Sequence, residues 1–190
     1  METAMSDTAL LVIDAQESFR HLDSWQEDQL PAYIERQQRL IDGARAAGLP
    51  ILQIFHITDA GPFSEASGLV ETLADLKISP DAIFKKRRHS ALVASGLDVW
   101  LTEHGIRRLI VSGLRTEQCC ETTTRHASDL GYTVDYVAEA TLTTPITDAT
   151  GHTWSPAELR ARTEAVLAGR FARIATVEEA LAAVRDRVAA

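Results

Sequence analysis

The residues "RRLIVSGLRTEQCCETTTRHASDLGYTVDYVAE", 107–139, run from an apolar strand through a helix to a second strand. Residues 107–114 and 132–139 are short apolar runs of strand length, and residues 117–130 between them have a helical pattern. A strand, a helix and a strand within about 30 residues form a βαβ unit, whose two strands lie parallel. The stretch therefore predicts a parallel sheet covered by helices.

The same alternation continues on both sides of this unit. Further strands are predicted at 8–16, 51–57, 81–86 and 171–175, and helices at 27–48, 67–76, 97–105 and after the capping residues Ser155 and Thr176. This spacing implies right-handed βαβ connections. The expected fold class is α/β, a single doubly wound (Rossmann-like) domain with a six-stranded, mainly parallel sheet and helices on both faces. We expect residues 1–7 to be a disordered N-terminus and the domain to span 8–190.

Composition and charge narrow the class of function. The 190 residues carry a net charge of −8, which argues against nucleic-acid binding, because phosphate neutralisation needs a basic face. No apolar run approaches the roughly 20 residues that span a bilayer, and the first residues do not form a secretory signal. Two cysteines in a chain without a leader favour a reducing compartment. We therefore expect a cytoplasmic protein with a small-molecule substrate and without nucleic-acid or membrane partners.

Three chemically active side chains follow predicted strands. Asp14 ends the first strand, Lys86 the third, and Cys119 lies just past the fourth. In doubly wound sheets, ligands bind beyond the carboxyl ends of the strands, so all three can face one crevice. Each also has a structural interpretation: Asp14 as a turn cap, Lys86 as a solvated member of "KKRRH" (85–89), and Cys119 as a packing residue.

The chain's only cysteines, Cys119 and Cys120, are adjacent. Their Cα atoms lie about 3.8 Å apart, too close for the usual disulfide range of about 4.4–6.8 Å. If Thr116 caps the helix, Cys119 lies in its first turn, where the pKa of a thiol falls from about 8.5 toward about 3.5–7.5. Cys120 points about 100° further round the helix and is expected to pack in the core.

The sequence supports a cysteine–histidine pair, a metal site or a redox motif less well. Only His56 and His89 lie near predicted strand ends, where a cysteine–histidine pair would need them. His56 and Asp59 are three residues apart, but no further histidine or cysteine pair completes a zinc-type ligand set. The adjacent cysteines do not form the C-x-x-C motif of redox proteins. We expect no metal and no cofactor.

Three motifs in this order resemble those of the isochorismatase-like cysteine hydrolase superfamily, which includes nicotinamidases, N-carbamoylsarcosine amidase and ureidoacrylate amidohydrolase. "LLVIDAQESF" (10–19) is similar to the family's D-x-Q-x-x-F. "KKRRHSAL" (85–92) is similar to K-x-R-[YFH]-S-A-F and places the family lysine at Lys86. "VSGLRTEQCCETTTRHASDLGY" (111–132) is similar to G-x-x-T-x-x-C-V-x-x-T…A…x-G-Y and places the nucleophile at Cys119. The match covers roughly residues 8–140.

The resemblance implies an Asp14–Lys86–Cys119 catalytic triad and a cis peptide before Arg115. It also implies an oxyanion hole formed by the backbone N–H groups of Arg115 and Cys119, and a homo-oligomer, either dimer or tetramer. Four side chains are interpreted as substrate-binding: Gln16, Phe19, His56 and Arg115, the last as a partner for a substrate carboxylate.

The sequence departs from the family pattern at three positions, Cys120, Leu92 and Glu139, where the family has valine, phenylalanine and aspartate. These changes can reshape the pocket, and the histidines that bind metal in nicotinamidases are incomplete here. We therefore expect a metal-independent cysteine hydrolase that cleaves a small amide, ureido or carbamoyl C–N bond through a thioester. The alternatives are an isochorismate-type vinyl-ether hydrolase and a non-catalytic binding or interaction protein on the same fold, in which "KKRRH" is a docking patch.

Overall fold

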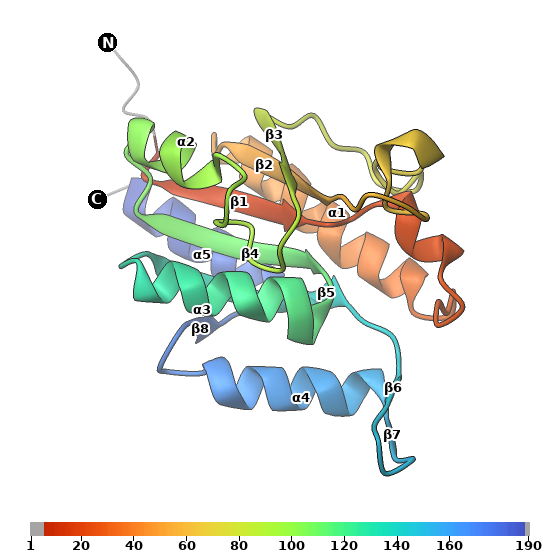
Figure 1. Ribbon diagram of the computed structural model, residues 1–190. Coiled ribbons are helices and arrows are strands. Elements are labelled where there is room, and N and C mark those ends of the chain that lie inside the picture. The colour runs from red at the N-terminus through yellow and green to blue at the C-terminus, as the bar shows by residue number, and fades with distance from the viewer. Residues whose placement is uncertain (1–5, 189–190) are drawn as a thin grey trace.

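The computed structural model describes residues 6–188 and has a parallel six-stranded sheet at its centre (Figure 1). The strand order is β3-β2-β1-β4-β5-β8, and every neighbouring pair is parallel. The strands are β1 (Thr8–Ile13), β2 (Ile51–His56), β3 (Ala82–Lys86), β4 (Arg108–Leu114), β5 (Thr133–Leu142) and β8 (Arg173–Ile174). The predicted fold class and all six predicted strands are confirmed. Of the expected disordered N-terminus, residues 1–5 lie outside the described residues.

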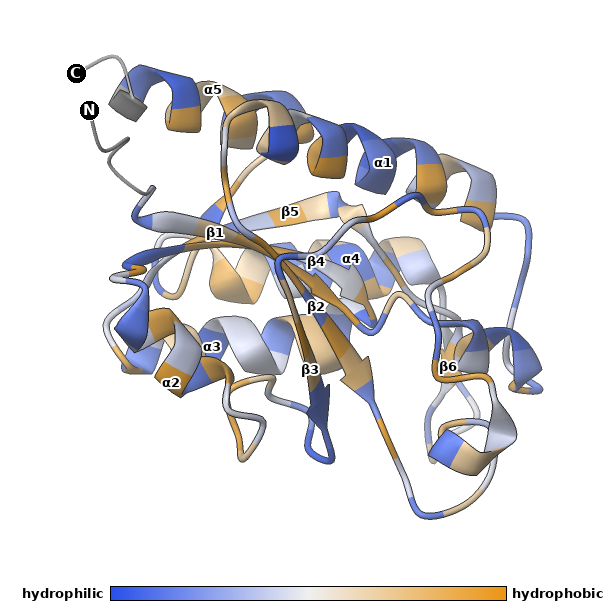
Figure 2. Cartoon of the chain, turned by 90° about the horizontal axis from the view of Figure 1, so that it is seen from above, coloured by the Kyte–Doolittle hydropathy of each residue, from blue (hydrophilic) through white to orange (hydrophobic). Residues whose placement is uncertain are grey.

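Helices cover both faces of the sheet, as predicted. Helices α1 (Leu30–Ala46) and α5 (Val177–Val188) lie on one face, and α2 (Leu97–Glu103), α3 (Glu121–Asp129) and α4 (Pro156–Leu167) lie on the other. Strand β1 shows why the sheet is buried: Leu10 and Val12 enter one core cluster, and Leu11 and Ile13 enter the other. Figure 2 shows the hydrophobic strands between helices whose outer faces are hydrophilic.

Two predicted helix starts are confirmed in detail. The Ser155 hydroxyl accepts a hydrogen bond from the Glu158 backbone N–H, and the Glu158 carboxylate accepts one from the Ser155 N–H, which is a capping box at α4. Thr176 and Glu179 make the same two bonds at the start of α5. These caps satisfy N–H groups that would otherwise have no partner at the helix ends.

The predicted helix at 67–76 is wrong. A single 3-10 turn, η2 (Glu65–Ser67), is followed by extended chain. This chain pairs with the segment after β1, through hydrogen bonds from Glu17 N to Glu71 O, Ser18 N to Leu69 O and Leu73 N to Ala15 O. Backbone pairing to a distant segment therefore replaces the local helix that the sequence pattern favours.

The structure has further elements that the sequence did not predict. A 3-10 helix, η1 (Glu17–His21), follows β1, and an antiparallel hairpin of β6 (Ile146–Thr147) and β7 (Thr153–Trp154) projects from the body beside α4 (Figure 1). Within residues 6–188, no helix combines the length and apolar composition that crossing a membrane requires.

Candidate active site

The ends of β1, β3 and β4 bring Asp14, Lys86 and Cys119 into contact. Lys86 Nζ donates hydrogen bonds to Asp14 Oδ2 at 2.8 Å and to Cys119 Sγ at 3.2 Å. The three residues are buried, with exposed fractions of 0%, 1% and 6%. These side chains therefore meet at one edge of the sheet, as their places after the strands predicted.

His56, at the end of β2, is a third partner of the lysine. Its Nδ1 lies 3.0 Å from Lys86 Nζ. Burial, followed by the charge of Lys86, lowers the pKa of His56 to about 4, so the ring is neutral near pH 7. A neutral ring that accepts at Nδ1 carries its proton on Nε2. The three N–H groups of the ammonium are thus distributed among Asp14, His56 and Cys119.

The close approach of β1 and β4 depends on Gly113. Its φ of 120° lies in the region that favours glycine, and a Cβ here would overlap the carbonyl oxygen of Ile13. Asp14 follows Ile13 directly, also with a positive φ of 50°. The cis peptide that the resemblance implied is present between Leu114 and Arg115.

The turn that carries the cysteine differs from the prediction. A π-helical turn, η3 (Thr116–Cys120), precedes α3, and the Cys120 N–H bonds to the Arg115 carbonyl at 3.2 Å. Thr116 does not cap this turn, because its hydroxyl is buried against Thr141, with 2.8 Å between the two Oγ1 atoms. Cys119 is therefore held by burial of the turn against β5 rather than by a side-chain cap.

The expectation of a lowered thiol pKa is also wrong. Burial, reinforced by the Asp14 carboxylate, raises the pKa of Cys119 to about 12, although Lys86 opposes the shift. Burial likewise raises the pKa of Asp14 against the opposing effect of Lys86. Burial alone would lower the pKa of Lys86, but Asp14 and Cys119 outweigh it and raise the pKa. Near neutral pH, Cys119 is therefore a thiol beside a charged lysine.

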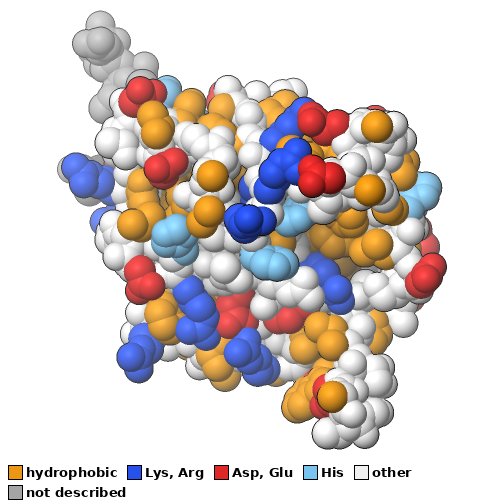
Figure 3. Space-filling model, viewed as in Figure 1, with side chains coloured by type: hydrophobic (Ala, Val, Ile, Leu, Met, Phe, Trp, Pro, Cys, Tyr) orange, Lys and Arg blue, Asp and Glu red, His pale blue; other side chains and the backbone are white. Residues whose placement is uncertain are grey.

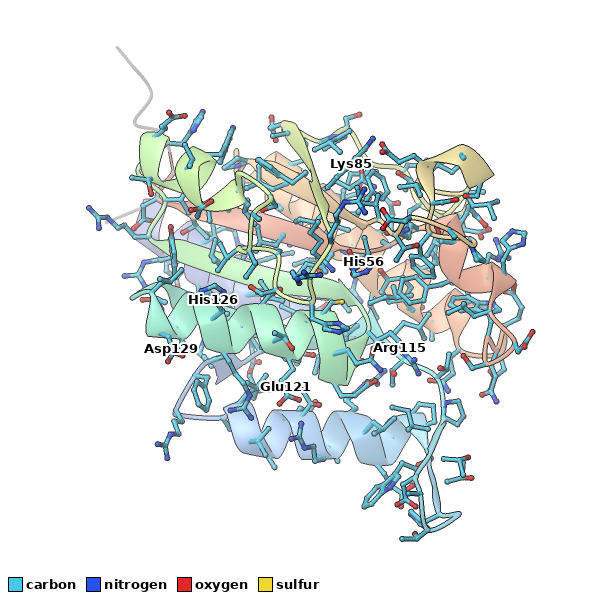
Figure 4. All side chains as sticks on the ribbon, viewed as in Figure 1. His56, Lys85, Arg115, Glu121, His126 and Asp129 are labelled. Atoms are coloured by element: carbon cyan, nitrogen blue, oxygen red, sulfur yellow. The ribbon has the colours of Figure 1, made fainter. Side chains whose placement is uncertain are left out.

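A cavity of about 200 Å³ opens onto the thiol. It is lined by Asp14, Phe19, Leu22, His56, Thr58, Phe63, His89, Arg115, Gln118 and Cys119. Figure 3 shows histidine side chains beside a hydrophobic hollow on this face, and Figure 4 labels His56 and Arg115. Three of the four predicted substrate-binding side chains, Phe19, His56 and Arg115, line this cavity.

Gln16, the fourth, does not line the cavity. Its side-chain amide is buried and bonds to both backbone polar groups of His56, donating to the carbonyl at 3.1 Å and accepting from the N–H at 2.8 Å. It also donates to the Ser18 hydroxyl at 2.9 Å. Gln16 therefore fixes the end of β2, which positions the His56 ring.

His89 and Phe63 also line the cavity, and neither was predicted from the sequence to be a site residue. His89 Nδ1 lies 3.8 Å from Cys119 Sγ, and the Phe63 ring packs edge-on against Phe19 with centroids 4.9 Å apart. His89 stands at the variable aromatic position of the "KKRRHSAL" motif, which could have indicated its place. Phe63 comes from the long connection after β2, where no sequence pattern indicated a site.

None of the three departures from the family pattern lines the cavity. Cys120 and Leu92 are buried in one core cluster. The Glu139 carboxylate accepts a hydrogen bond from the Val177 N–H at 2.6 Å, at the start of α5. These residues therefore act through packing and helix capping.

Asp14, His56 and Cys119 offer ligand atoms within 4.8 Å of one another, a spacing that a metal ion can use. Lys86 Nζ lies 2.8–3.2 Å from one such atom of each residue. A cation bound there would meet the charge of the ammonium, so this set does not fit a metal while Lys86 is in place. The expectation that no metal binds stays a prediction.

Comparison with known proteins assigns this chain to a class of hydrolases. Residues 8–179 match the isochorismatase domain. The chain belongs to the isochorismatase family.

Several relatives align with most of this chain. A crystal structure of a candidate isochorismatase from Burkholderia xenovorans LB400 is 30% identical, with a TM-score of 0.87 and coverage of 96% of this chain and 89% of the other. Nicotinamidase 3 of Arabidopsis thaliana is 28% identical over 151 residues, which are 71% of this chain and 73% of the relative. Ureidoacrylate amidohydrolase RutB of Variovorax paradoxus is 28% identical over 173 residues, and the match covers 72% of this chain and 69% of the relative.

Proposed function

We propose that this hydrolase cleaves a C–N bond of a small amide, ureido or carbamoyl compound, with Cys119 as nucleophile. The observation that carries the proposal is the buried Lys86, whose ammonium bonds to both Asp14 and Cys119. A lysine in this position stabilises whichever of the two groups carries the negative charge. Two relatives named for nicotinamide and ureidoacrylate hydrolysis support the choice of substrate class.

Asp14 is proposed as the general base that activates the thiol. Its Oδ1 is buried and has no hydrogen-bond partner among the described residues, so it is free to take a proton. Burial raises the pKa of this carboxyl, which makes it a stronger base than an exposed aspartate. The thiol proton passes to Asp14, and the thiolate that remains is paired with Lys86.

The thiolate then attacks the substrate carbonyl carbon, and negative charge develops on the carbonyl oxygen. Backbone N–H groups of Arg115 and Cys119 are proposed to bind this oxygen. The C–N bond breaks as Asp14 gives its proton to the leaving nitrogen, which departs as ammonia or an amine and leaves a thioester. Water gives a proton to Asp14 and attacks the thioester carbon, the C–S bond breaks and the carboxylic acid leaves, and the proton on Asp14 passes to the Cys119 sulfur to restore the thiol.

The cavity limits the size and shape of the substrate. Its volume of about 200 Å³ is close to that of an engineered cavity of about 150 Å³ that binds benzene. Phe19, Leu22 and Phe63 are apolar residues of its lining, and His56, whose neutral ring carries its proton on Nε2, is one of the polar residues. A substrate with a small, flat apolar body and one amide group fits these surroundings.

A panel of small amides and ureides with ammonia detection tests this function. Cys119→Ala and Asp14→Asn are each expected to abolish ammonia release from any amide that the wild-type protein hydrolyses. Wild-type turnover in both variants would refute the triad. Turnover of isochorismate with no activity on the amides would favour the vinyl-ether alternative.

The non-catalytic alternative has little support from the "KKRRH" segment. Lys85 pairs with Glu65, and Arg87 pairs with Asp59 at 2.5 Å, so two of its cations are engaged within the chain. These two contacts instead join β3 and the residue just after it to the long loop that carries Phe63. A homo-oligomer and a cytoplasmic location stay predictions. Light scattering that gives the 20.8 kDa mass of one chain would contradict the oligomer.

A further inference from the structure

Arg115 lines the cavity, and its guanidinium is already bound within the protein. Its Nε donates to Thr143 Oγ1 at 3.3 Å, and its Nη2 donates to the Thr144 carbonyl at 3.0 Å and to the Thr144 hydroxyl. These contacts hold the side chain against the segment after β5, where 15% of it is exposed. Arg115 is therefore fixed in position before any substrate arrives.

Glu117, two residues further on, is an unusual buried acid. Only 8% of its side chain is exposed, and neither carboxylate oxygen has a hydrogen-bond partner among the described residues. A buried carboxylate without hydrogen bonds is unfavourable unless an opposite charge compensates it. Arg115 is the one cation that pairs with Glu117 in the described chain, with Nε 3.8 Å from Oε1.

This pair removes a positive charge that the cavity would otherwise offer. Lys86 does not replace it, because its three N–H groups are directed at Asp14, His56 and Cys119. Asp14 lines the cavity and is itself acidic. A substrate carboxylate in the cavity would therefore meet Asp14 without a free arginine or lysine to bind it.

We propose that Glu117 neutralises Arg115, so that the site accepts small uncharged amides and discriminates against substrates that carry a carboxylate. This inference rests on the proposed use of Cys119 and its cavity, and it specifies the substrate class. Glu117 is a specificity-determining residue that acts through Arg115 and does not itself line the cavity.

Two alkylating probes test the charge preference without a known substrate. Iodoacetamide and iodoacetate have almost the same size and the same leaving group, but only iodoacetate is charged. In both reactions the Cys119 sulfur bonds to the probe's CH₂ carbon, iodide leaves, and the thiol proton goes to the buffer. Fragmentation of peptide 116–125 in the mass spectrometer assigns the label to Cys119 or to Cys120. Relative to free glutathione, wild-type Cys119 is expected to favour iodoacetamide by about tenfold or more, because charge acts strongly in a partly buried site.

Glu117→Gln provides the decisive variant, since glutamine keeps the shape and removes the charge. It is expected to shift the preference toward iodoacetate by about tenfold, because the unmasked guanidinium then attracts the anion. Glu121→Gln is the matched control. Its carboxylate is also buried, but it pairs with Arg125 and Arg162 between α3 and α4 (Figure 4), so the probe preference is expected to stay as in the wild type.

Two outcomes would overturn the inference. One is wild-type Cys119 that reacts with iodoacetate as readily as with iodoacetamide, a result that does not depend on any variant folding. The other is a folded Glu117→Gln protein, verified by thermal unfolding, whose preference is unchanged or matches that of Glu121→Gln. Absence of amide turnover would refute the proposed function and leave the charge preference measurable, so the two failures are distinguishable.

Discussion

Lys86 and Asp14 form an ion pair in which neither side chain has exposed surface, with 2.8 Å between Nζ and Oδ2. Both charges are removed from water, and the lysine extends from β3 past β2 to reach the end of β1. Each charge is tolerated because the other is present. The stability of the fold therefore depends on having both Asp14 and Lys86 in the site.

Lys86→Met is expected to destabilise the protein by about 3–5 kcal/mol, because it leaves Asp14 buried and uncompensated. The double variant Asp14→Asn/Lys86→Met removes both charges and is expected to recover most of this loss. Urea unfolding at pH 7 followed by tryptophan fluorescence measures both variants. A double variant no more stable than Lys86→Met alone would show that the two charges are not coupled.

The Asp14→Asn variant separates two effects of the Asp14 carboxylate, one on amide turnover and one on the reactivity of the Cys119 thiol. Amide turnover is expected to fall by about 100-fold or more, because the general base is lost. Alkylation of Cys119 by iodoacetamide at pH 8 is expected to become faster, because the Asp14 carboxylate raises the pKa of the thiol. Slower alkylation in this variant would contradict the electrostatic role given to Asp14, whatever happens to turnover.

The sequence predicted the sheet and the meeting of Asp14, Lys86 and Cys119 for a simple reason. Strands buried on both faces are continuous apolar runs, and the carboxyl ends of parallel strands share one edge. The residue that follows each run therefore has a known place before any side-chain contact is known. The capping boxes at Ser155 and Thr176 were predicted equally well, because they depend on contacts between residues three apart.

The remaining features depend on long-range contacts. Residues 67–76 have a local helical pattern, but their backbone pairs with the segment after β1. Threonine is a common helix-capping residue, yet the Thr116 hydroxyl forms a hydrogen bond with the Thr141 hydroxyl of β5 instead. The raised pKa of Cys119 comes first from burial, which the spacing of residues along a chain does not reveal. Glu117 could not be distinguished in the sequence from an exposed acid.

Gly113→Ala is expected to destabilise the protein by at least about 3 kcal/mol, because the new Cβ would overlap the backbone of Ile13, which cannot move aside as a flexible side chain can. Gly48→Ala is the matched control. Gly48 also has a positive φ, of 72°, but open space surrounds its Cβ position, so a loss of only about 1–2 kcal/mol is expected. Urea unfolding measures both, and equal losses would show that backbone conformation, and not the contact with β1, explains the need for Gly113.

His56→Asn tests the neutral histidine beside Lys86, because asparagine can still accept from the ammonium but does not titrate. Well above pH 6.5, the ordinary pKa of histidine, the wild-type ring is neutral in both the folded and the unfolded state. Between pH 6.5 and about 4 the unfolded chain binds a proton that the folded protein does not, because burial lowers the pKa of His56 to about 4. The free energy of unfolding is therefore expected to fall as the pH falls through this range.

This one ring contributes less than about 1.4 kcal/mol per pH unit to the slope of the free energy of unfolding against pH, because the half-buried ring is partly screened by solvent. Urea unfolding at intervals from pH 8 to pH 4 measures it as the difference between the wild-type protein and His56→Asn. The free energies of unfolding of the wild-type protein and of His56→Asn are expected to change in parallel from pH 8 to 7. Below pH 6.5 they are expected to converge or cross, because the wild-type protein loses stability faster. Parallel curves down to pH 4 would mean that His56 is protonated equally in the folded and unfolded states, and Lys86 would then lack the neutral acceptor assigned to it.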